Sequence, residues 1–261
     1  MSQSESSALL VKDADGVLWI TLNRPEARNA INHDLRRLLL KAITETAQDP
    51  KIRAVVIQGD EKAFCSGGDV KEMGVDKSIV AMKLCEGSAI IEGIANLAKP
   101  VIAGVRGHAS GAGFSLAMAC DHIVAQDDAT FTSVFSKRGL IPDLSGTFWL
   151  ARQVGLYRAK DIVFSARPVS AVEAHSLGLV TTLTSAKDYQ SELAKVVKRF
   201  ATGPTLAFGL AKRLLNHTFE NDLATALERE GLSQGELSTT SDHLNAIEAF
   251  KNKTEPTFEG R

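Results

Sequence analysis

Short apolar runs alternate along the chain with longer stretches whose apolar residues recur at helical spacing. The runs are four or five residues long and are bounded by polar or turn-forming residues, as is typical of buried strands. They lie at residues 18–22, 54–57, 101–105 and 122–125. Since loops and helical stretches separate these runs, the pattern indicates an α/β layout with a largely buried sheet.

Three helices are predicted between these strands. Asn32 can cap the first helix, and the apolar residues of that helix fall on one face; they are Leu35, Leu38, Leu39, Ala42 and Ile43. The second helix is predicted over about 78–97. The third, over 114–119, follows a glycine-rich loop.

The last quarter of the chain is predicted to be mainly helical. Ser170 and Glu173 have the spacing of a capping box, and Gly178 can end the short helix that they begin. Further helices are expected after residue 189, with breaks at 203–204 and near 231–235, and the final helix covers 241–251.

This change in pattern divides the chain into an α/β core, residues 1–200, and a helical C-terminal oligomerisation region, residues 201–261. A helical tail on an α/β core is a common way to build a subunit interface. A tail folded back on its own core is the alternative, because an amphipathic helix does not reveal what it packs against.

Composition narrows the class of protein. The 261 residues can form one large α/β domain, and 44% hydrophobic and 23% charged residues are ordinary for a soluble enzyme. The net charge is −1 and Lys and Arg are not clustered, which argues against nucleic acid as a partner. The helix after Asn32 mixes acidic with basic residues, which argues against RNA binding.

The cysteines, the first residues and the histidines exclude further classes. The three cysteines are odd in number and lack CxxC spacing, so no disulfide framework is expected. Residues 1–7 are polar, unlike a signal peptide, and no apolar run is long enough for a membrane span. The six histidines lack metal-ligand spacing. We therefore expect a cytoplasmic protein without a metal and without a membrane partner.

Two glycine-rich loops can bring backbone N–H groups to a ligand. In the loop 63–70, Gly67 and Gly68 allow close approach to the backbone, although such a pair is also common in simple turns. The loop 107–115 joins a buried strand to a helix, so free N–H groups of the first helical turn suit an oxyanion there. Its glycines do not match G-x-G-x-x-G, and no P-loop motif occurs.

Asp143 is a candidate general base. It follows Pro142, precedes a Ser-Gly turn and lies in the mostly apolar stretch 131–149. In an apolar cleft the pKa of its carboxyl group would rise, as a general base requires. Capping of the next helix is the alternative use of this side chain.

Taken together, these segments resemble the enoyl-CoA hydratase/isomerase (crotonase) family nearly from end to end. The resemblance rests on "TLNRPEARNA", "FCSGGDVKEM", "KPVIAGVRGHASGAG", "CDHIVA" and, near the C-terminus, "AFKNKTEPTFEG". It implies a crotonase-like α/β fold, which is a spiral of ββα units with a helical C-terminal trimerisation region. It also implies a homotrimer or a dimer of trimers, and an oxyanion hole formed by the N–H groups of Gly68 and Ala112.

The resemblance implies an acyl-CoA thioester as the substrate, with coenzyme A as part of it and no separate cofactor. The first loop would hold coenzyme A largely through its backbone, at Ala63, Cys65, Gly68, Asp69, Val70 and Lys71. Arg28 would lie near the phosphates, and a neighbouring subunit would contribute Phe250 and Lys253 at the adenine end. Each charged residue has a solvated surface charge as its alternative. Cys65 is expected to pack in the core, not to act as a nucleophile.

The chain departs from the hydratases of this family at two positions. Where those enzymes carry the glutamates that hold and activate water, this chain has Ser115 and Phe135, which would instead line the substrate site. Neither side chain can act as a carboxylate base. Asp143 occupies a slot that holds a catalytic aspartate in several relatives. The local pattern "FSKRGLIPD" is similar to that of the phenylacetate-pathway epoxyphenylacetyl-CoA/enoyl-CoA isomerase.

These departures favour an enoyl-CoA isomerase. Asp143 would move the proton, and the N–H groups of Gly68 and Ala112 would stabilise the thioester enolate. Three alternatives stay open: an enoyl-CoA hydratase acting on 2-enoyl-CoA, an acyl-CoA thioester hydrolase, and a non-catalytic acyl-CoA binder.

Overall fold

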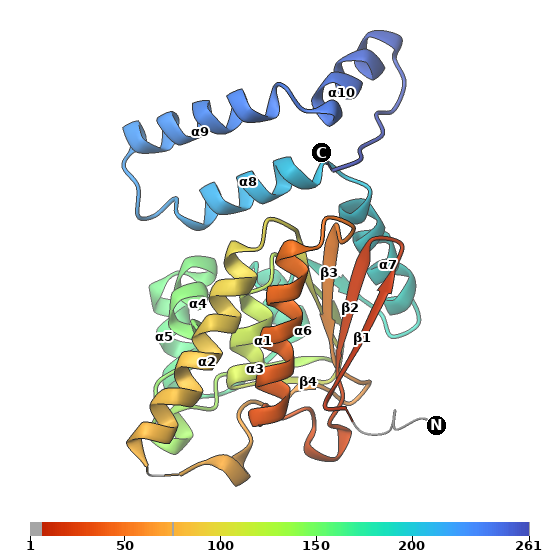
Figure 1. Cartoon of the computed structure of the whole chain (residues 1–261). Coiled ribbons are helices and arrows are strands. Elements are labelled where there is room, and N and C mark those ends of the chain that lie inside the picture. The colour runs from red at the N-terminus through yellow and green to blue at the C-terminus, as the bar shows by residue number, and fades with distance from the viewer. Residues whose placement is uncertain (1–6, 75, 261) are drawn as a thin grey trace.

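The computed structural model describes residues 7–74 and 76–260, and its strands form two sheets (Figure 1). The six-stranded sheet has the order β1-β2-β3-β5-β7-β10, formed by β1 Leu9–Ala14, β2 Val17–Leu22, β3 Ala54–Gln58, β5 Val101–Val105, β7 His122–Gln126 and β10 Thr182–Thr184. The four-stranded sheet has the order β4-β6-β8-β9, formed by β4 Ala63–Cys65, β6 His108–Ser110, β8 Thr130–Thr132 and β9 Pro168–Ser170.

Successive segments of the chain give one strand to each sheet and then a helix. Strands β3 and β4 are followed by α2 (Lys77–Asn96), and β5 and β6 are followed by α3 (Ala112–Met118). In the large sheet β3, β5 and β7 are neighbours and parallel, and in the small sheet β4, β6 and β8 are neighbours and parallel. Each unit is therefore displaced by one strand from the unit before it, which is the predicted spiral of ββα units.

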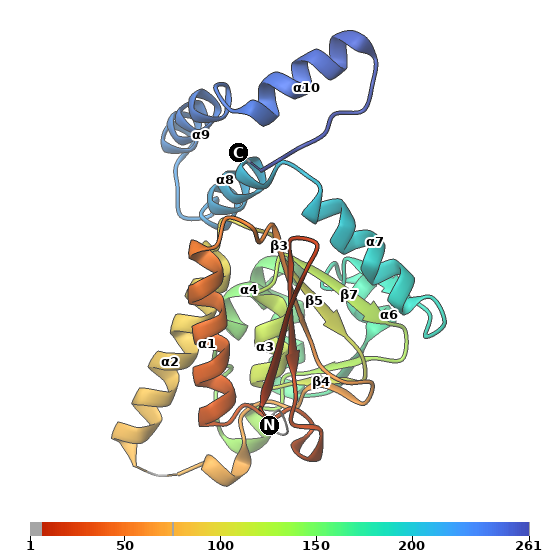
Figure 2. The same ribbon diagram turned by 45° about the vertical axis from the view of Figure 1, so that its right-hand side comes forward.

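The remaining helices cover the sheets and form the C-terminal region. They are α1 His33–Gln48, α4 Gly146–Val154, α5 Leu156–Ser165, α6 Ala171–Ser176, α7 Tyr189–Ala201, α8 Thr205–Asn216, α9 Leu223–Leu237 and α10 Ser241–Asn252. Short 3-10 turns lie at η1 Pro25–Ala27, η2 Val70–Glu72 and η3 Ser136–Arg138. Figure 2 shows α1 and α2 on one side of the large sheet and α7 on the other.

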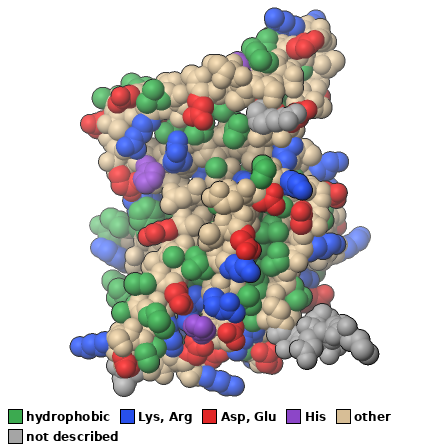
Figure 3. All heavy atoms as spheres, viewed as in Figure 1, with side chains coloured by type: hydrophobic (Ala, Val, Ile, Leu, Met, Phe, Trp, Pro, Cys, Tyr) green, Lys and Arg blue, Asp and Glu red, His purple; other side chains and the backbone are tan. Residues whose placement is uncertain are grey.

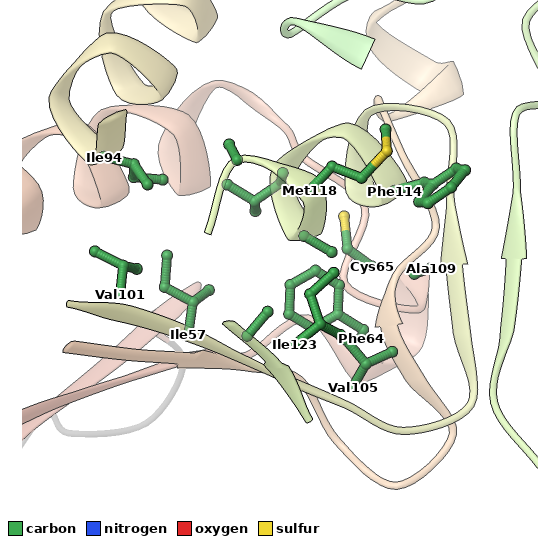
Figure 4. Close-up of a cluster of buried hydrophobic side chains, with 14 of the residues drawn as sticks. Ile57, Phe64, Cys65, Ile94, Val101, Val105, Ala109, Phe114, Met118 and Ile123 are labelled. Carbon is green, nitrogen blue, oxygen red and sulfur yellow. The ribbon is translucent and has the colours of Figure 1, made fainter. Parts of the chain in front are cut away.

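Both faces of the large sheet are covered at its central strands, which explains why β3, β5 and β7 read as continuous apolar runs. Every residue of β5 and of α3 is buried. In the core between this sheet and α3, Ile57 and Ile123 face Phe114 and Met118 (Figure 4). On the opposite face, Val56 packs in a second cluster that α7 completes.

The predicted helix caps are confirmed, and one predicted helix end is wrong. The Asn32 side chain accepts a hydrogen bond from the Leu35 N–H at 2.9 Å, and Ser170 caps α6 in the same way. The break predicted near 231–235 does not occur, because α9 continues through both glycines. A glycine costs a helix only about 1 kcal/mol, and the chain turns instead between α8 and α9, where Asp222 caps α9. Strands β1 and β10, the strands of the small sheet, and helices α4 and α5 were not predicted.

Helices α8, α9 and α10 lie together at one end of the molecule (Figures 1 and 2). Helix α8 packs against α2, where Asn216 donates a hydrogen bond to the Ala95 carbonyl oxygen at 3.0 Å. The predicted division at residue 200 falls at the end of α7, and a separate role for the residues beyond it stays a prediction. Within the described residues, no helix is both long and apolar enough to cross a membrane.

Candidate active site

The first glycine-rich loop is joined to the segment 28–31 by backbone hydrogen bonds. The Ile31 N–H donates to the Gly67 carbonyl oxygen at 2.7 Å, and the Asp69 N–H donates to the Ile31 carbonyl oxygen at 3.1 Å. Ile31 thus bonds to the residues on either side of Gly68, in the pattern of a parallel bridge. The N–H group of Gly68 therefore points away from this segment.

The second glycine-rich loop lies directly against the first. Gly67 has a φ of 103°, and a methyl group on it would come within 2.9 Å of the Ser110 carbonyl oxygen. A methyl group on Gly113 would overlap the Cys65 carbonyl oxygen. Glycine is therefore required at both positions for the two backbones to approach this closely.

The close approach leaves two N–H groups free. Ala112 is the first residue of α3, so its N–H has no acceptor within the helix, and the N-cap residue Gly111 has no side chain to supply one. In the described part of the chain, neither the Ala112 N–H nor the Gly68 N–H makes a hydrogen bond. A methyl group on Gly67 would lie 3.4 Å from the Ala112 nitrogen, so the two loops meet here. Paired free N–H groups are what an oxyanion hole requires.

Asp143 lies between η3 and α4, directly after the buried Pro142. Burial raises the pKa of its carboxyl group to about 6, although its own backbone N–H lowers it slightly. Among the described residues, Oδ1 of this carboxyl group is buried without a hydrogen-bond partner. The alternative that Asp143 caps α4 is wrong, because the N-cap is Ser145 and no side chain caps this helix.

The start of α4 packs against α3 beside Asp143. A methyl group on Gly146 would come within 2.6 Å of the Ser115 Oγ and 3.0 Å of the Pro142 Cβ. Ser115 is buried about one helical turn after Ala112. The segment that carries Asp143 is therefore held against the helix whose first N–H is free.

Phe135 borders the second loop. Its Cζ lies 3.8 Å from the position of a methyl group on Gly111, and the residue is buried. The two positions that differ from the hydratases, Ser115 and Phe135, thus both lie near the start of α3. Neither brings a carboxylate to this region.

Some residues expected to hold coenzyme A already use their backbone groups within the protein. The Lys71 N–H donates to the Asp69 Oδ1 at 3.0 Å, and the Ala63 N–H donates to the Asp60 Oδ1 at 2.9 Å. The Val70 N–H has no hydrogen-bond partner among the described residues. A ligand at this loop is thus offered the N–H groups of Gly68 and Val70 and the exposed Lys71 side chain.

Arg24, which the sequence analysis missed, fixes the first loop. Its guanidinium pairs with Asp69 at 2.9 Å and donates to the Ala30 carbonyl oxygen at 2.6 Å. The Lys71 N–H lowers the pKa of the Asp69 carboxyl group most, burial opposes this, and Arg24 lowers it further. The carboxylate of Asp69 therefore shapes the loop. Its partner Asp69 is distant in sequence, so no local pattern could reveal this pair. The one sequence feature that could have drawn attention to Arg24 is its place in the "TLNRPEARNA" segment.

The predicted phosphate and adenine contacts lie apart from one another. Arg28 is exposed beside the first loop and has a φ of 51°. Phe250 is 85% exposed, and Lys253 ends α10. Figure 1 shows α10 at the far end of the molecule from β4 and from the loop that precedes α2. One subunit therefore does not bring Phe250 and Lys253 to the two glycine-rich loops.

The cysteine of the first loop and the metal-binding residue types show no sign of a further catalytic centre among the described residues. Burial raises the pKa of the Cys65 thiol to about 12, against a smaller opposing effect of the Gly67 N–H, so it is poorly suited to be a nucleophile. Across residues 7–74 and 76–260, no three or more His, Cys, Asp or Glu side chains gather closely enough to hold a metal ion. Figure 3 shows Lys and Arg interspersed with Asp and Glu on the viewed face.

Comparisons with known proteins agree with this architecture. The profile of the family described as Enoyl-CoA hydratase/isomerase matches residues 12–261. The chain is 33% identical to the 1,2-epoxyphenylacetyl-CoA isomerase of Escherichia coli (strain K12), over 94% of this chain and 96% of the relative. It is 32% identical to the short-chain-enoyl-CoA hydratase of Clostridium acetobutylicum, over 95% of this chain and 96% of the relative.

The fold comparison covers the same length. The crystal structure of an enoyl-CoA hydratase from Bacillus anthracis matches with a TM-score of 0.93 at 30% sequence identity, over 98% of this chain and 100% of that one. Sequence and fold thus agree over nearly the whole chain, and the relatives include both a hydratase and an isomerase. The chain therefore belongs to the enoyl-CoA hydratase/isomerase family and has the crotonase fold.

Proposed function

We propose that the chain is an enoyl-CoA isomerase, which shifts a double bond within an acyl-CoA thioester. The observation that carries the proposal is the buried carboxyl group of Asp143, whose pKa burial raises to about 6. A base with this pKa is ionised at neutral pH and still holds a proton well enough to return it. A double-bond shift needs one such base, whereas hydration needs a held water as well.

The mechanism uses groups that meet near the start of α3. Asp143 takes a proton from C2 of a 3-enoyl thioester, and negative charge develops on the thioester oxygen. The N–H groups of Gly68 and Ala112 donate hydrogen bonds to that oxygen. Each donor lowers the barrier by about 3 kcal/mol, since it binds charge that appears only during the reaction. The protonated Asp143 then returns the proton to C4, which leaves the double bond between C2 and C3.

Coenzyme A enters this reaction as part of the substrate, and no separate cofactor takes part. The free N–H group of Val70, the ammonium group of Lys71 and the guanidinium of Arg28 lie on or beside the first loop. They suit the anionic part of a coenzyme-A thioester. The apolar Phe135 and the small Ser115 border the acyl group in this arrangement.

We also propose that the chain forms a homotrimer or a dimer of trimers through its C-terminal helices. Large apolar side chains are exposed on α9 and α10, including Leu223, Leu227, Leu244 and Phe250. Such surfaces usually mark contacts with another chain. In the assembly, a neighbouring subunit brings its Phe250 and Lys253 to the adenine end of coenzyme A.

Hydration of a 2-enoyl-CoA is the second candidate, because the chain is 32% identical to a named hydratase. This function requires a group that holds and activates water in place of Ser115 and Phe135. Asp143 alone would have to activate the water that attacks the double bond and also supply the proton that completes the addition. We therefore rank hydration below isomerisation.

A substrate panel separates the candidate functions. Conversion of 3-enoyl-CoA to 2-enoyl-CoA is followed by the absorbance of the conjugated thioester, and hydration of 2-enoyl-CoA by loss of that absorbance. Free thiol, detected with dithionitrobenzoate, reports thioester hydrolysis. We expect isomerisation to be at least about a hundredfold faster than hydration, as the missing water-activating groups imply. Faster hydration, faster thiol release, or no turnover of any thioester would contradict the proposal.

A further inference from the structure

Two residues after Asp143 adopt an unusual backbone conformation. Leu144 has a φ of 47° and Ser145 has a φ of 64°. Left-handed φ values are unfavourable for residues with a side chain, and most of all for a bulky residue such as leucine. Contacts elsewhere in the structure must therefore stabilise this turn.

The Leu144 side chain has such a contact on α2. A methyl group on Gly87 would overlap the Leu144 Cδ2, so the leucine occupies the space that a side chain at residue 87 would fill. Gly87 is buried, and Leu144 is partly buried against the main core. The end of the Leu144 side chain is thus seated in a notch that exists only because residue 87 is glycine.

The carboxyl group of Asp143 lacks a comparable anchor of its own. Its Oδ1 has no hydrogen-bond partner in the described part of the chain. The Asp143 carbonyl oxygen accepts a hydrogen bond from the Gly146 N–H at 2.9 Å, which closes the turn over the left-handed pair. The direction of the carboxyl group is therefore set by the backbone of this turn.

We propose that Leu144 and Gly87 are positioning residues for Asp143: the leucine, seated in the Gly87 notch of α2, holds the left-handed turn that directs the carboxyl group. This inference rests on the proposed function in naming Asp143 as the base. The role of the notch in fixing the carboxyl group is independent of which reaction that group serves.

Gly87→Ala tests the proposal because it fills the notch while it leaves the Asp143 residue itself unsubstituted. The added methyl pushes the Leu144 side chain out, so the turn loosens and water reaches the carboxyl group. We expect kcat for isomerisation to fall about tenfold or more with little change in KM, since misplacing a catalytic group lowers the rate of the chemical step. Alanine also favours a helix over glycine, so α2 itself should not be weakened.

The double variant Gly87→Ala, Leu144→Ala tests whether the two residues act through one contact. Both single variants break the same contact, so the double variant should be no less active than the poorer of the two single variants. Leu144→Ala by itself should lose activity because it leaves the notch empty. Two independent defects would instead multiply, and that result would overturn the inference.

The protonation of Asp143 gives a readout that a general loss of stability would not produce. NMR titration of labelled aspartate carboxyl groups, with Asp143 assigned from its loss in Asp143→Asn, should show its pKa near 6 in the wild type. In folded Gly87→Ala and Leu144→Ala the pKa should fall towards the ordinary aspartate value, because the carboxyl group gains water. An unchanged pKa and kcat in Leu144→Ala would refute the positioning role even if Gly87→Ala failed to fold.

The same experiments distinguish this inference from the proposed function. If Asp143→Asn leaves isomerisation intact, the proposed function is wrong, while the titration of Asp143 in the Gly87 and Leu144 variants still tests the notch. If Asp143→Asn abolishes isomerisation but the titration and kcat are unchanged in both notch variants, the function stands and the positioning inference fails.

Discussion

At the scale of single residues, five buried side-chain polar atoms lack a hydrogen-bond partner within the described residues, and those of Asp143 and Tyr189 can be compared directly. Asp143 has a carboxyl oxygen without a partner, and Tyr189 has a buried hydroxyl group without one, both within the described residues. Of these two residues, Asp143 is the one whose segment packs against α3, the helix that begins with a free N–H group. An unpartnered buried polar group beside a candidate site suggests a catalytic role that compensates for its cost in stability. A group of this kind far from the site has no such role, and replacing it should stabilise the protein.

Asp143→Asn should stabilise the protein at neutral pH while it removes the proposed base. Burial raises the pKa of this carboxyl group from its ordinary value of 3.8 to about 6. As pH rises between these values the unfolded chain ionises first, so the wild type loses up to about 3 kcal/mol of folding free energy. The amide has no such loss. Denaturant unfolding at pH 8 should favour the variant, and the gain should vanish below about pH 4. An equal gain at both pH values would contradict the burial of the charge.

Tyr189→Phe should raise the free energy of unfolding by about 1 kcal/mol, because a buried hydroxyl group without a partner costs about that much. The ring itself, which lies 5.2 Å from the Arg106 guanidinium, is retained. Tyr157, which is 91% exposed, is the matched control, and Tyr157→Phe should change stability very little. Destabilisation by Tyr189→Phe in urea unfolding would show that the hydroxyl group has a partner in solution.

Residue-scale properties differ in how far the sequence could predict them. The raised pKa of Asp143 was predictable, because its neighbours in the chain are apolar. The left-handed conformation of Leu144 was not, since such a φ is normally signalled by glycine, and this position carries a leucine. Its contact with Gly87 joins two segments that no local pattern connects.

At the scale of helices and strands, local sequence signals were reliable where a capping residue or a short apolar run determines the structure. The Asn32 cap and the buried runs of β3 and β5 needed no tertiary information. The end of α9 was mispredicted, because glycine weakens a helix by only about 1 kcal/mol and the two glycines do not stop it. Strand β1 escaped prediction because it is an edge strand whose middle residues are exposed, which removes the apolar run.

Ala112→Pro tests the start of α3, because it deletes one of the two proposed oxyanion donors. Proline is tolerated in the first turn of a helix, so the protein should fold. Turnover should fall about a hundredfold or more, as expected for a lost oxyanion donor. Ala112→Gly, which keeps the N–H group, is the control and should retain most activity. A folded proline variant with unchanged turnover would remove Ala112 from the mechanism.

At the scale of the whole molecule, the C-terminal tail returns from α10 to the core. Arg53 donates to the Phe258 carbonyl oxygen at 2.7 Å, and Asp242 of α10 accepts from the Glu259 and Gly260 N–H groups at 2.6 and 2.9 Å. These contacts hold α10 in a defined place although it packs little against other elements. Hydrophobic periodicity predicted four strands of the large sheet and most helices, but it missed the small sheet, whose strands have only three residues each. The order of the strands as a spiral followed only from the family resemblance, because pairing within the sheets is a long-range property.

The assembly is tested by light scattering at micromolar concentration. A trimer or hexamer of the 28.0 kDa chain is expected. Removal of the residues after Ser241 deletes most of α10 and the tail, so the mass should fall and KM for an acyl-CoA should rise. A lone 28.0 kDa species for the full chain would contradict the trimer. If truncation alters neither mass nor KM, the roles proposed for Phe250 and Lys253 are wrong.

The most direct measurement of the central claim follows a 3-enoyl-CoA in deuterated water with the wild type and with Asp143→Asn. The wild type should move the double bond and incorporate deuterium, because the proton on Asp143 exchanges with solvent between its removal and its return. In the Asn variant both should fall by about two to four orders of magnitude, while binding of a coenzyme-A product persists. Rapid hydration of a 2-enoyl-CoA by the wild type that survives in Asp143→Asn would contradict the claim.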